Sequence, residues 1–240
     1  MFETFLVKPL YNIFIFLIGI MPFGDVGFAI IALTLIIRVI FYPAFSASIR
    51  TQMGMQEVQG DLDHINKTYK DQPDERAKRT MELFKEKNIR PFAGFLALFV
   101  QIPIFLALYF AFFREGLPSI ATDLLYSFVH APQAVNLMFL GLVNLQSAHN
   151  IPIAIIVALT QYGAIRLSVM RTAPGIARMA PEKQSAQRIQ QYMMLYGMPI
   201  LLGSIAYSFP AAVGIYFTTG NLVSMGQEWI IKRQLEKSAA

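Results

Sequence analysis

The chain contains no cysteine, which excludes disulfide frameworks, thiol nucleophiles and thiolate metal sites. It is also poor in charge, because only 15% of its 240 residues are Asp, Glu, Lys or Arg whereas 55% are hydrophobic. Soluble proteins carry about 25% charged residues, so these side chains are too few to cover a soluble surface evenly. The composition therefore favours a membrane protein.

Motifs for enzymatic chemistry are missing as well. The three histidines, His64, His130 and His149, lack a metal-ligand spacing such as H-E-x-x-H, and no Ser-His pair lies in an apolar segment. The sequence has no Walker-type loop and no G-x-G-x-x-G loop. We therefore expect no covalent catalysis, no nucleotide hydrolysis, no bound metal and no cofactor.

Five apolar segments are long enough to span a membrane, because crossing about 30 Å of hydrocarbon takes about 20 residues. Pro210 marks a tight corner between the last two segments, since its ring fixes φ and it has no backbone N–H to donate. The sequence predicts an all-α membrane protein with five transmembrane helices, at residues 25–45, 92–113, 151–170, 191–209 and 210–231.

The remaining segments are too short or too polar to span. Residues 1–24 are predicted to form an extracytoplasmic interfacial amphipathic helix. A signal peptide is the less favoured alternative, because the start is nearly uncharged and no cleavage motif follows. Residues 114–150 are predicted to be an extracytoplasmic loop. The predicted cytoplasmic parts are a helical hairpin, a loop and a tail, at residues 46–91, 171–190 and 232–240.

The distribution of Lys and Arg predicts the orientation. The three cytoplasmic parts hold 16 of the 20 Lys and Arg, whereas only Lys8 and Arg114 lie in the extracytoplasmic parts. This asymmetry follows the positive-inside rule. We therefore expect the N-terminus outside and the C-terminus in the cytoplasm, and we interpret most of the net charge of +5 as a topology signal.

The predicted hairpin has nine Lys or Arg and eight Asp or Glu, so its charge is nearly balanced. This balance, without interleaved aromatic residues, favours a solvated helical surface over a nucleic-acid patch. Residues at heptad spacing, apolar except for Asn88, predict the inner face of an antiparallel helical hairpin, with Met55, Val58, Leu62, Ile65 and Tyr69 on one helix and Ala77, Met81, Phe84 and Asn88 on the other.

Arg38 lies inside the first predicted span, where an arginine costs about 2.5–3.5 kcal/mol on insertion scales. Three explanations stay open: its side chain snorkels to the inner interface, it pairs with Glu228, or it faces a water-filled cavity that receives an anionic group. Further polar residues at membrane depth favour the cavity. We predict a hydrophilic groove lined by Arg38, Thr34, Tyr42, Gln101, Gln161, Thr218, Asn221 and Gln227.

The ordered segments LTLIIRVIFYPAFSASIRTQMGMQEVQGDLDHINKTYKDQ, MELFKEKNIRPFAGFLALFVQIPIFLALYFAF and FPAAVGIYFTTGNLVSMGQEW closely resemble the YidC/Oxa/Alb membrane protein insertases. The resemblance implies a groove in the inner leaflet, open to the cytoplasm and to lipid, in a bacterial plasma (inner) membrane. By this resemblance the groove arginine is Arg38. Further residues match the family pattern, namely Gln101 with Pro103, Pro210, Tyr216, Asn221 and Gln227. The entry to the second span departs from that pattern.

The function that the resemblance implies is insertion and folding of client membrane proteins. The implied partners are nascent membrane proteins with short N-terminal tails and the lipid bilayer; the ribosome, weakly because the tail is short, and a Sec translocon are further candidates. No sequence-specific nucleic acid binding is expected. Two alternatives use the same cavity: a small channel or transporter, and a non-catalytic assembly factor for membrane proteins.

Overall fold

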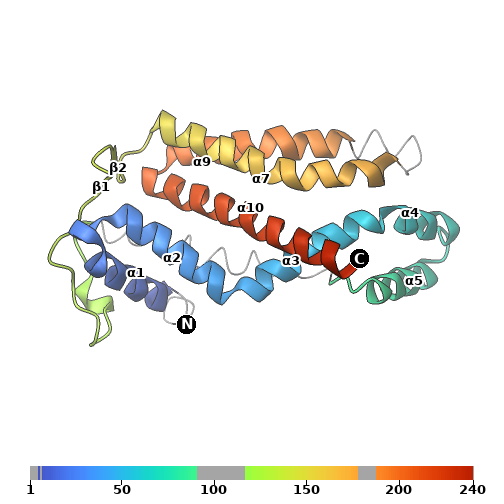
Figure 1. The fold of residues 1–240 in the computed structure, drawn as a ribbon, viewed down its shortest axis with the longest axis horizontal. Helices are drawn as coiled ribbons and strands as arrows, with labels where there is room; N and C mark the ends of the chain where they lie inside the picture. The colour runs from blue at the N-terminus through green and yellow to red at the C-terminus, as the bar shows by residue number, and fades with distance from the viewer. Residues whose placement is uncertain (1–4, 6, 91–116, 178–187, 240) are drawn as a thin grey trace. The chain divides into compact units, whose positions relative to one another are not determined.

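The computed structural model describes residues 5, 7–90, 117–177 and 188–239, and helices dominate them (Figure 1). The main helices are α1 (Lys8–Ile20), α2 (Val26–Ile40), α3 (Tyr42–Glu57), α4 (Gln59–Thr68), α5 (Pro73–Glu86), α7 (Ile151–Ala177), α9 (Met198–Ser208) and α10 (Ala211–Ala239). Strands β1 (Met138–Phe139) and β2 (Val143–Asn144) form an antiparallel pair. The helical content confirms the predicted all-α class, with this small pair as an addition.

The described residues belong to two compact units. The first unit takes its residues from Met1–Phe41, Leu98–Gln161 and Pro199–Val223. The second unit takes its residues from Tyr42–Ala97, Tyr162–Met198 and Ser224–Ala240. The predicted second span at 92–113 lies outside the described residues, as do residues 178–187 of the predicted cytoplasmic loop at 171–190. Residues 171–177 of that loop instead continue α7.

In the first unit, α1 packs against α2, and the chain reverses direction between them (Figure 1). Asp25 caps the N-terminus of α2. Its buried carboxylate accepts hydrogen bonds from the backbone N–H groups of Gly27 at 2.8 Å and Phe28 at 3.1 Å. This is the usual N-cap interaction. The buried contact residues are Tyr11, Phe14, Ile15 and Ile18 on α1 and Ile30, Leu33 and Ile37 on α2.

A polar residue also ties α1 to the segment predicted as the extracytoplasmic loop. The Asn12 side chain, 2% exposed, donates to the carbonyl of Leu124 at 3.0 Å and accepts from the N–H of Tyr126 at 2.7 Å. The Tyr11 hydroxyl accepts from the N–H of Ala121 at 3.1 Å. These bonds satisfy backbone groups of a loop that has little secondary structure of its own.

Two glycines allow close helix packing in the first unit. A Cβ at Gly214 on α10 would overlap Cγ2 of Ile153 on α7. A Cβ at Gly203 on α9 would lie 3.2 Å from Cβ of Ala158 on α7. Small residues at such contacts let helix backbones approach closely. Buried Pro210 separates α9 from α10, at the position where the sequence places a corner.

The first predicted span does not form one straight helix. α2 ends at Ile40, and α3 begins at Tyr42 after a break at Phe41. Pro43 explains the break, because it has no N–H to donate to the preceding turn and its ring crowds the carbonyl of that turn. Within the described residues, no helix taken alone is both long and apolar enough to cross a bilayer; only the bent pair Val26–Ile40 and Tyr42–Met55 passes together.

In the second unit, α4 and α5 pack as a helical hairpin around Val58, Leu62, Phe84 and Ile89. The heptad pattern correctly places the first three of these inside. It is wrong for three residues on the second helix, since Ala77, Met81 and Asn88 are exposed.

The exposure of Asn88 follows from how α5 ends. Asn88 has a φ of 52°, and its N–H donates to the carbonyl of Lys85 while the N–H of Ile89 donates to Phe84. This bonding is a Schellman motif, in which a left-handed residue ends the helix and the next apolar residue folds back onto it. Ile89 therefore occupies the place in the core that the heptad spacing assigned to Asn88.

Candidate functional site

Arg38 lies in the last turn of α2, whose other residues are apolar except for Thr34. The guanidinium is half-buried, and its Nη2 donates a hydrogen bond of 3.1 Å to the backbone carbonyl of Gly220 on α10. A carbonyl within a helix has a second lone pair that can accept such a bond. The charge of Arg38 is thus directed at the backbone of another helix in the same unit.

The neighbouring residue on α10 makes a second contact between helices. Asn221 Nδ2 donates to the hydroxyl oxygen of Thr160 on α7 at 3.2 Å. The Thr160 hydroxyl in turn donates to the carbonyl of Ile156 at 2.9 Å, one turn earlier in α7. The Thr160 hydroxyl therefore acts as donor and acceptor at once, as hydroxyls at helix contacts can.

These two contacts bring three helices together at one level. Gly220 and Asn221 are consecutive on α10, so the first connects α10 to α2 and the second connects α10 to α7. We call Arg38, Thr160, Gly220 and Asn221 the polar layer. It presents one positive charge, that of Arg38, beside the largely apolar residues of α2.

Three other residues predicted for the groove lie in the same unit. Thr34 is 3% exposed, and its hydroxyl donates to the carbonyl of Ile30 at 2.7 Å within α2. Gln161, which follows Thr160, and Thr218 on α10 are both half-buried. The structure brings Arg38 and Asn221 to the polar layer and leaves the Thr34 hydroxyl in a local bond.

The remaining predicted groove residues are placed elsewhere. Tyr42 begins α3 in the second unit with 36% of its surface exposed, and Gln227 on α10 is buried in the second unit. Gln101 lies outside the described residues. Pairing of Arg38 with Glu228 stays a prediction, because these residues belong to different units.

Two residues at these contacts are not among the predicted groove residues. Thr160 bonds Asn221, whereas the predicted groove residue is its neighbour Gln161. Asn12 is a buried polar residue in an apolar helix, and that unusual position was the available signal. Among the residues that the structure describes, no three His, Asp or Glu side chains gather where they could hold a metal ion.

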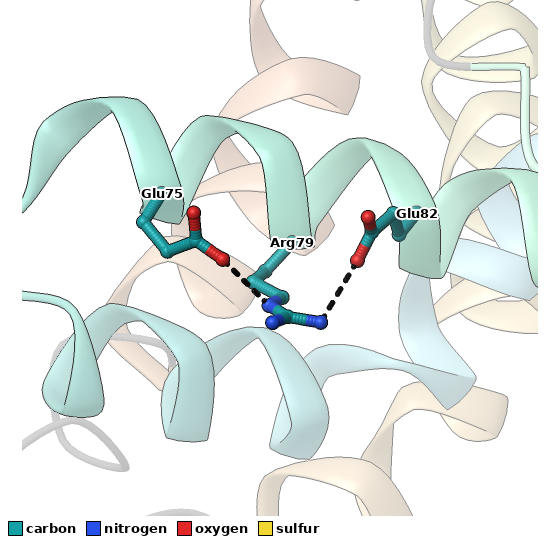
Figure 2. A network of polar contacts seen from close by, with 3 residues as sticks. All are labelled: Glu75, Arg79 and Glu82. Carbon is teal, nitrogen blue, oxygen red and sulfur yellow. Dashed lines mark hydrogen bonds and ion pairs between the residues drawn. The ribbon is translucent and has the colours of Figure 1, made fainter.

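The second unit contains a charged network of another kind (Figure 2). On α5, Arg79 bonds Glu75 at 3.0 Å one turn earlier and Glu82 at 3.2 Å one turn later. The carboxylate of Glu82, followed by Tyr69 and the Glu75 carboxylate, raises the pKa of Arg79 above its ordinary value. All three charged side chains are well exposed, so solvent screens these attractions.

Comparison with known proteins places the chain in a family. Residues 19–238 match the family model of the 60Kd inner membrane protein. The chain belongs to this family, which confirms the resemblance to the YidC/Oxa/Alb insertases, and we place it in a bacterial membrane.

Two bacterial relatives illustrate the similarity. The chain is 29% identical over 237 residues to the membrane protein insertase YidC of Bordetella pertussis, covering 99% of this chain and 37% of that protein. It is 29% identical over 213 residues to the membrane protein insertase YidC of Francisella tularensis subsp. novicida, covering 89% of this chain and 33% of that protein. The chain thus spans about a third of the length of the curated relatives it matches.

Proposed function

We propose that this chain is a membrane protein insertase that inserts and helps to fold client membrane proteins. The observation that supports this most strongly is the family match, which covers residues 19–238 of 240. The polar layer supports it further, because a positive charge among apolar helices is costly and is usually functional. The activity needs neither covalent chemistry nor nucleotide hydrolysis.

In this proposal, Arg38 attracts the client. A short acidic or polar N-terminal segment of a nascent membrane protein enters a hydrated groove in the inner leaflet, where it meets the guanidinium. Attraction between opposite charges is several times stronger in surroundings of low dielectric constant than in water. Predicted groove residues of the first unit, namely Gln161, Thr218 and Asn221, supply polar partners that replace lost water.

Partition into lipid drives the remaining steps. The apolar segment of the client leaves the groove for the bilayer, and each buried methylene gains about 0.8 kcal/mol. A client carboxylate that moves outward gains up to about 2.3 kcal/mol per charge per 100 mV of membrane potential. The protein shortens the path through hydrocarbon, and it supplies no energy itself.

The proposed topology and partners follow the sequence. The N-terminus is extracytoplasmic and the C-terminus cytoplasmic, with the α4–α5 hairpin in the cytoplasm. Nascent membrane proteins with short N-terminal tails and lipid are the main partners. A weak ribosome contact and cooperation with a Sec translocon are secondary proposals.

Substitution of Arg38 tests this function. Arg38→Ala and Arg38→Lys would be reconstituted in proteoliposomes and compared for insertion of clients with and without N-terminal acids. We expect Arg38→Ala to slow insertion of acid-bearing clients about tenfold or more, since a hydrogen bond to a charged group is worth about 1.5–3 kcal/mol. Arg38→Lys should restore part of the rate, because it keeps the charge.

The matched control is Arg76→Ala, which removes an arginine from α5 in the hairpin. It should leave insertion of both client types unchanged. Equal insertion of acid-bearing clients by Arg38→Ala and the unsubstituted chain would refute the proposed role of Arg38. Ion flux without any client would instead favour a channel or transporter, and insertion that occurs only with added partner proteins would favour an assembly factor.

A further inference from the structure

Three tyrosines and two arginines lie on two helical segments of the second unit. On α7, the guanidinium carbon of Arg166 lies 5.9 Å from the ring centre of Tyr162, one turn earlier. The Tyr162 and Tyr196 rings are 6.0 Å apart, and the Tyr196 and Tyr192 rings are 6.3 Å apart and nearly parallel at 16°. Arg188 lies one turn before Tyr192. We call these five residues the tyrosine–arginine patch.

The two helical segments of the patch have the same order of residue types. On α7, Arg166 follows Tyr162 by one turn. On the other segment, Arg188 precedes Tyr192 by one turn. In both segments the arginine therefore lies on the side of the predicted loop at 171–190. In the proposed topology, that side faces the cytoplasm. Tyrosine next to arginine in this order is typical of the membrane–water interface, where rings and cations meet lipid headgroups.

The patch is open to its surroundings. Tyr192 and Tyr196 are 61% and 51% exposed, and both arginines are exposed. Tyrosine rings usually bury most of their area, so a row with two such exposed rings is unusual for a face in water. In a protein of an inner membrane family, lipid can cover these rings.

The positive charge of the patch is not balanced within its own two helical segments. Residues 151–177 and 188–208 contain no Asp or Glu, although they contain the two arginines of the patch. Guanidinium groups bind phosphate through paired hydrogen bonds, and tyrosine hydroxyls can add further donors. Charge complementarity therefore points to a phosphate-bearing ligand.

A change of helix type lies within the patch. Residues Met193–Gly197 form a π turn, which includes Tyr196 and directly follows Tyr192. π turns are rare and often occur at functional sites, because the extra residue shifts side chains out of the regular helical register. Here the π turn sets the positions of the two stacked rings.

We propose that the tyrosine–arginine patch binds the headgroup of an anionic phospholipid in the cytoplasmic leaflet. Arg166 and Arg188 bind the phosphate, and the three tyrosine rings pack against the headgroup and the upper acyl chain. This site needs no client, so it is separate from the proposed insertion activity. It fixes the depth of α7 and of residues 188–208 in the bilayer.

Fluorescence quenching can test lipid contact directly, because Trp229 is the only tryptophan. Tyr192→Trp in a Trp229→Phe background would be reconstituted in vesicles with brominated phosphatidylglycerol or brominated phosphatidylcholine at equal fractions. We expect stronger quenching by the anionic lipid. Equal quenching by the two lipids would overturn the proposal.

Native mass spectrometry of the full chain gives the second measurement. Arg166→Ala/Arg188→Ala should lower the preference for phosphatidylglycerol over phosphatidylcholine by about fivefold per arginine, since each basic residue near an anionic surface contributes about 1 kcal/mol. Arg166→Lys/Arg188→Lys should keep much of the preference, and it covers the case in which the alanine variant fails to fold.

The control is Arg233→Ala, because Arg233 lies 3.9 Å over the Trp229 ring and is therefore another exposed arginine on an aromatic residue. It lacks the row of tyrosines, so it should change the lipid preference little. An equal loss in Arg233→Ala would mean general attraction to anionic lipid and would overturn a specific site. An unchanged lipid preference in both the alanine and the lysine variants of Arg166 and Arg188 would also overturn the proposal.

Discussion

Arg38 on α2 and Arg79 on α5 carry the same guanidinium in opposite surroundings. Arg38 is half-buried among apolar helices and donates to the Gly220 carbonyl on another helix. Arg79 is exposed between two carboxylates of its own helix. Arg38 and Asn221 bond helices far apart in the sequence, whereas Arg79 bonds neighbouring turns of its own helix. The surroundings of Arg38 therefore favour a functional role, whereas those of Arg79 favour a role in solubility.

The largest expected difference between the two regions concerns glycine. Gly214→Ala should destabilise the first unit by about 1–3 kcal/mol, because the added methyl group overlaps Ile153 in a packed contact between helices. Gly60→Ala on the hairpin is the control, since nothing lies within 4 Å of the added Cβ. It should stabilise α4 by about 0.5–1 kcal/mol.

Thermal unfolding in detergent, followed by far-UV circular dichroism, would measure both variants. Similar shifts of the unfolding midpoint in Gly214→Ala and Gly60→Ala would mean that the two regions do not differ in how tightly these glycines are packed. A loss in Gly214→Ala that becomes smaller in an Ile153→Ala background would assign it to one pair of residues, because alanine lacks the Cγ2 that the added methyl group overlaps.

A smaller effect is expected in the polar layer. Asn221→Ala removes the hydrogen bond to Thr160, and contacts of this kind within membranes average about 0.6 kcal/mol. A double-mutant cycle with Thr160→Ala, measured by the same unfolding assay, would isolate the pair. A coupling free energy near zero would show that the bond does not stabilise the contact between α7 and α10.

The smallest effect is expected for Arg79→Ala. Both of its ion pairs are exposed, so the unfolding midpoint should not change measurably. Because its pKa is raised in the folded chain, its contribution is fully present below the ordinary pKa of arginine and is lost only as the pH rises through the raised value. Titration of Arg79 therefore adds no pH dependence near neutrality. A clear loss of stability in this variant would contradict the view of the hairpin as a region of local contacts.

Sequence patterns predicted the parts of the fold that depend on composition and spacing. The helical class, the helix break at Pro210 and most of the hairpin core follow from apolar periodicity and from the chemistry of proline. Patterns could not predict Ile89 in that core, because a left-handed Asn88 ends the periodic segment before it. They also treated residues 25–45 as one helix, although Pro43 was a visible reason for the break at Phe41.

The candidate site was harder to predict than the helices. Arg38 stood out because a charge in an apolar helix is costly, and Asn221 was among the polar residues assigned beside it. The identity of their partners could not be predicted. One is a backbone carbonyl, which every residue has, and the other is a threonine beside a more polar glutamine. Such pairing depends on how helices rotate about their axes, and the rotation is set by packing contacts such as Gly214 with Ile153.

The hydrogen bonds of Asn12 to the loop can form only late in the synthesis of the chain. Its two loop partners follow it by 112 and 114 residues, so neither is available when α1 leaves the ribosome. At about 5–20 residues per second, α1 waits about 6–23 s before Leu124 and Tyr126 are made. During that interval, Asn12 has neither of its two loop partners. The N-terminal helix is therefore synthesised first and fixed in place late.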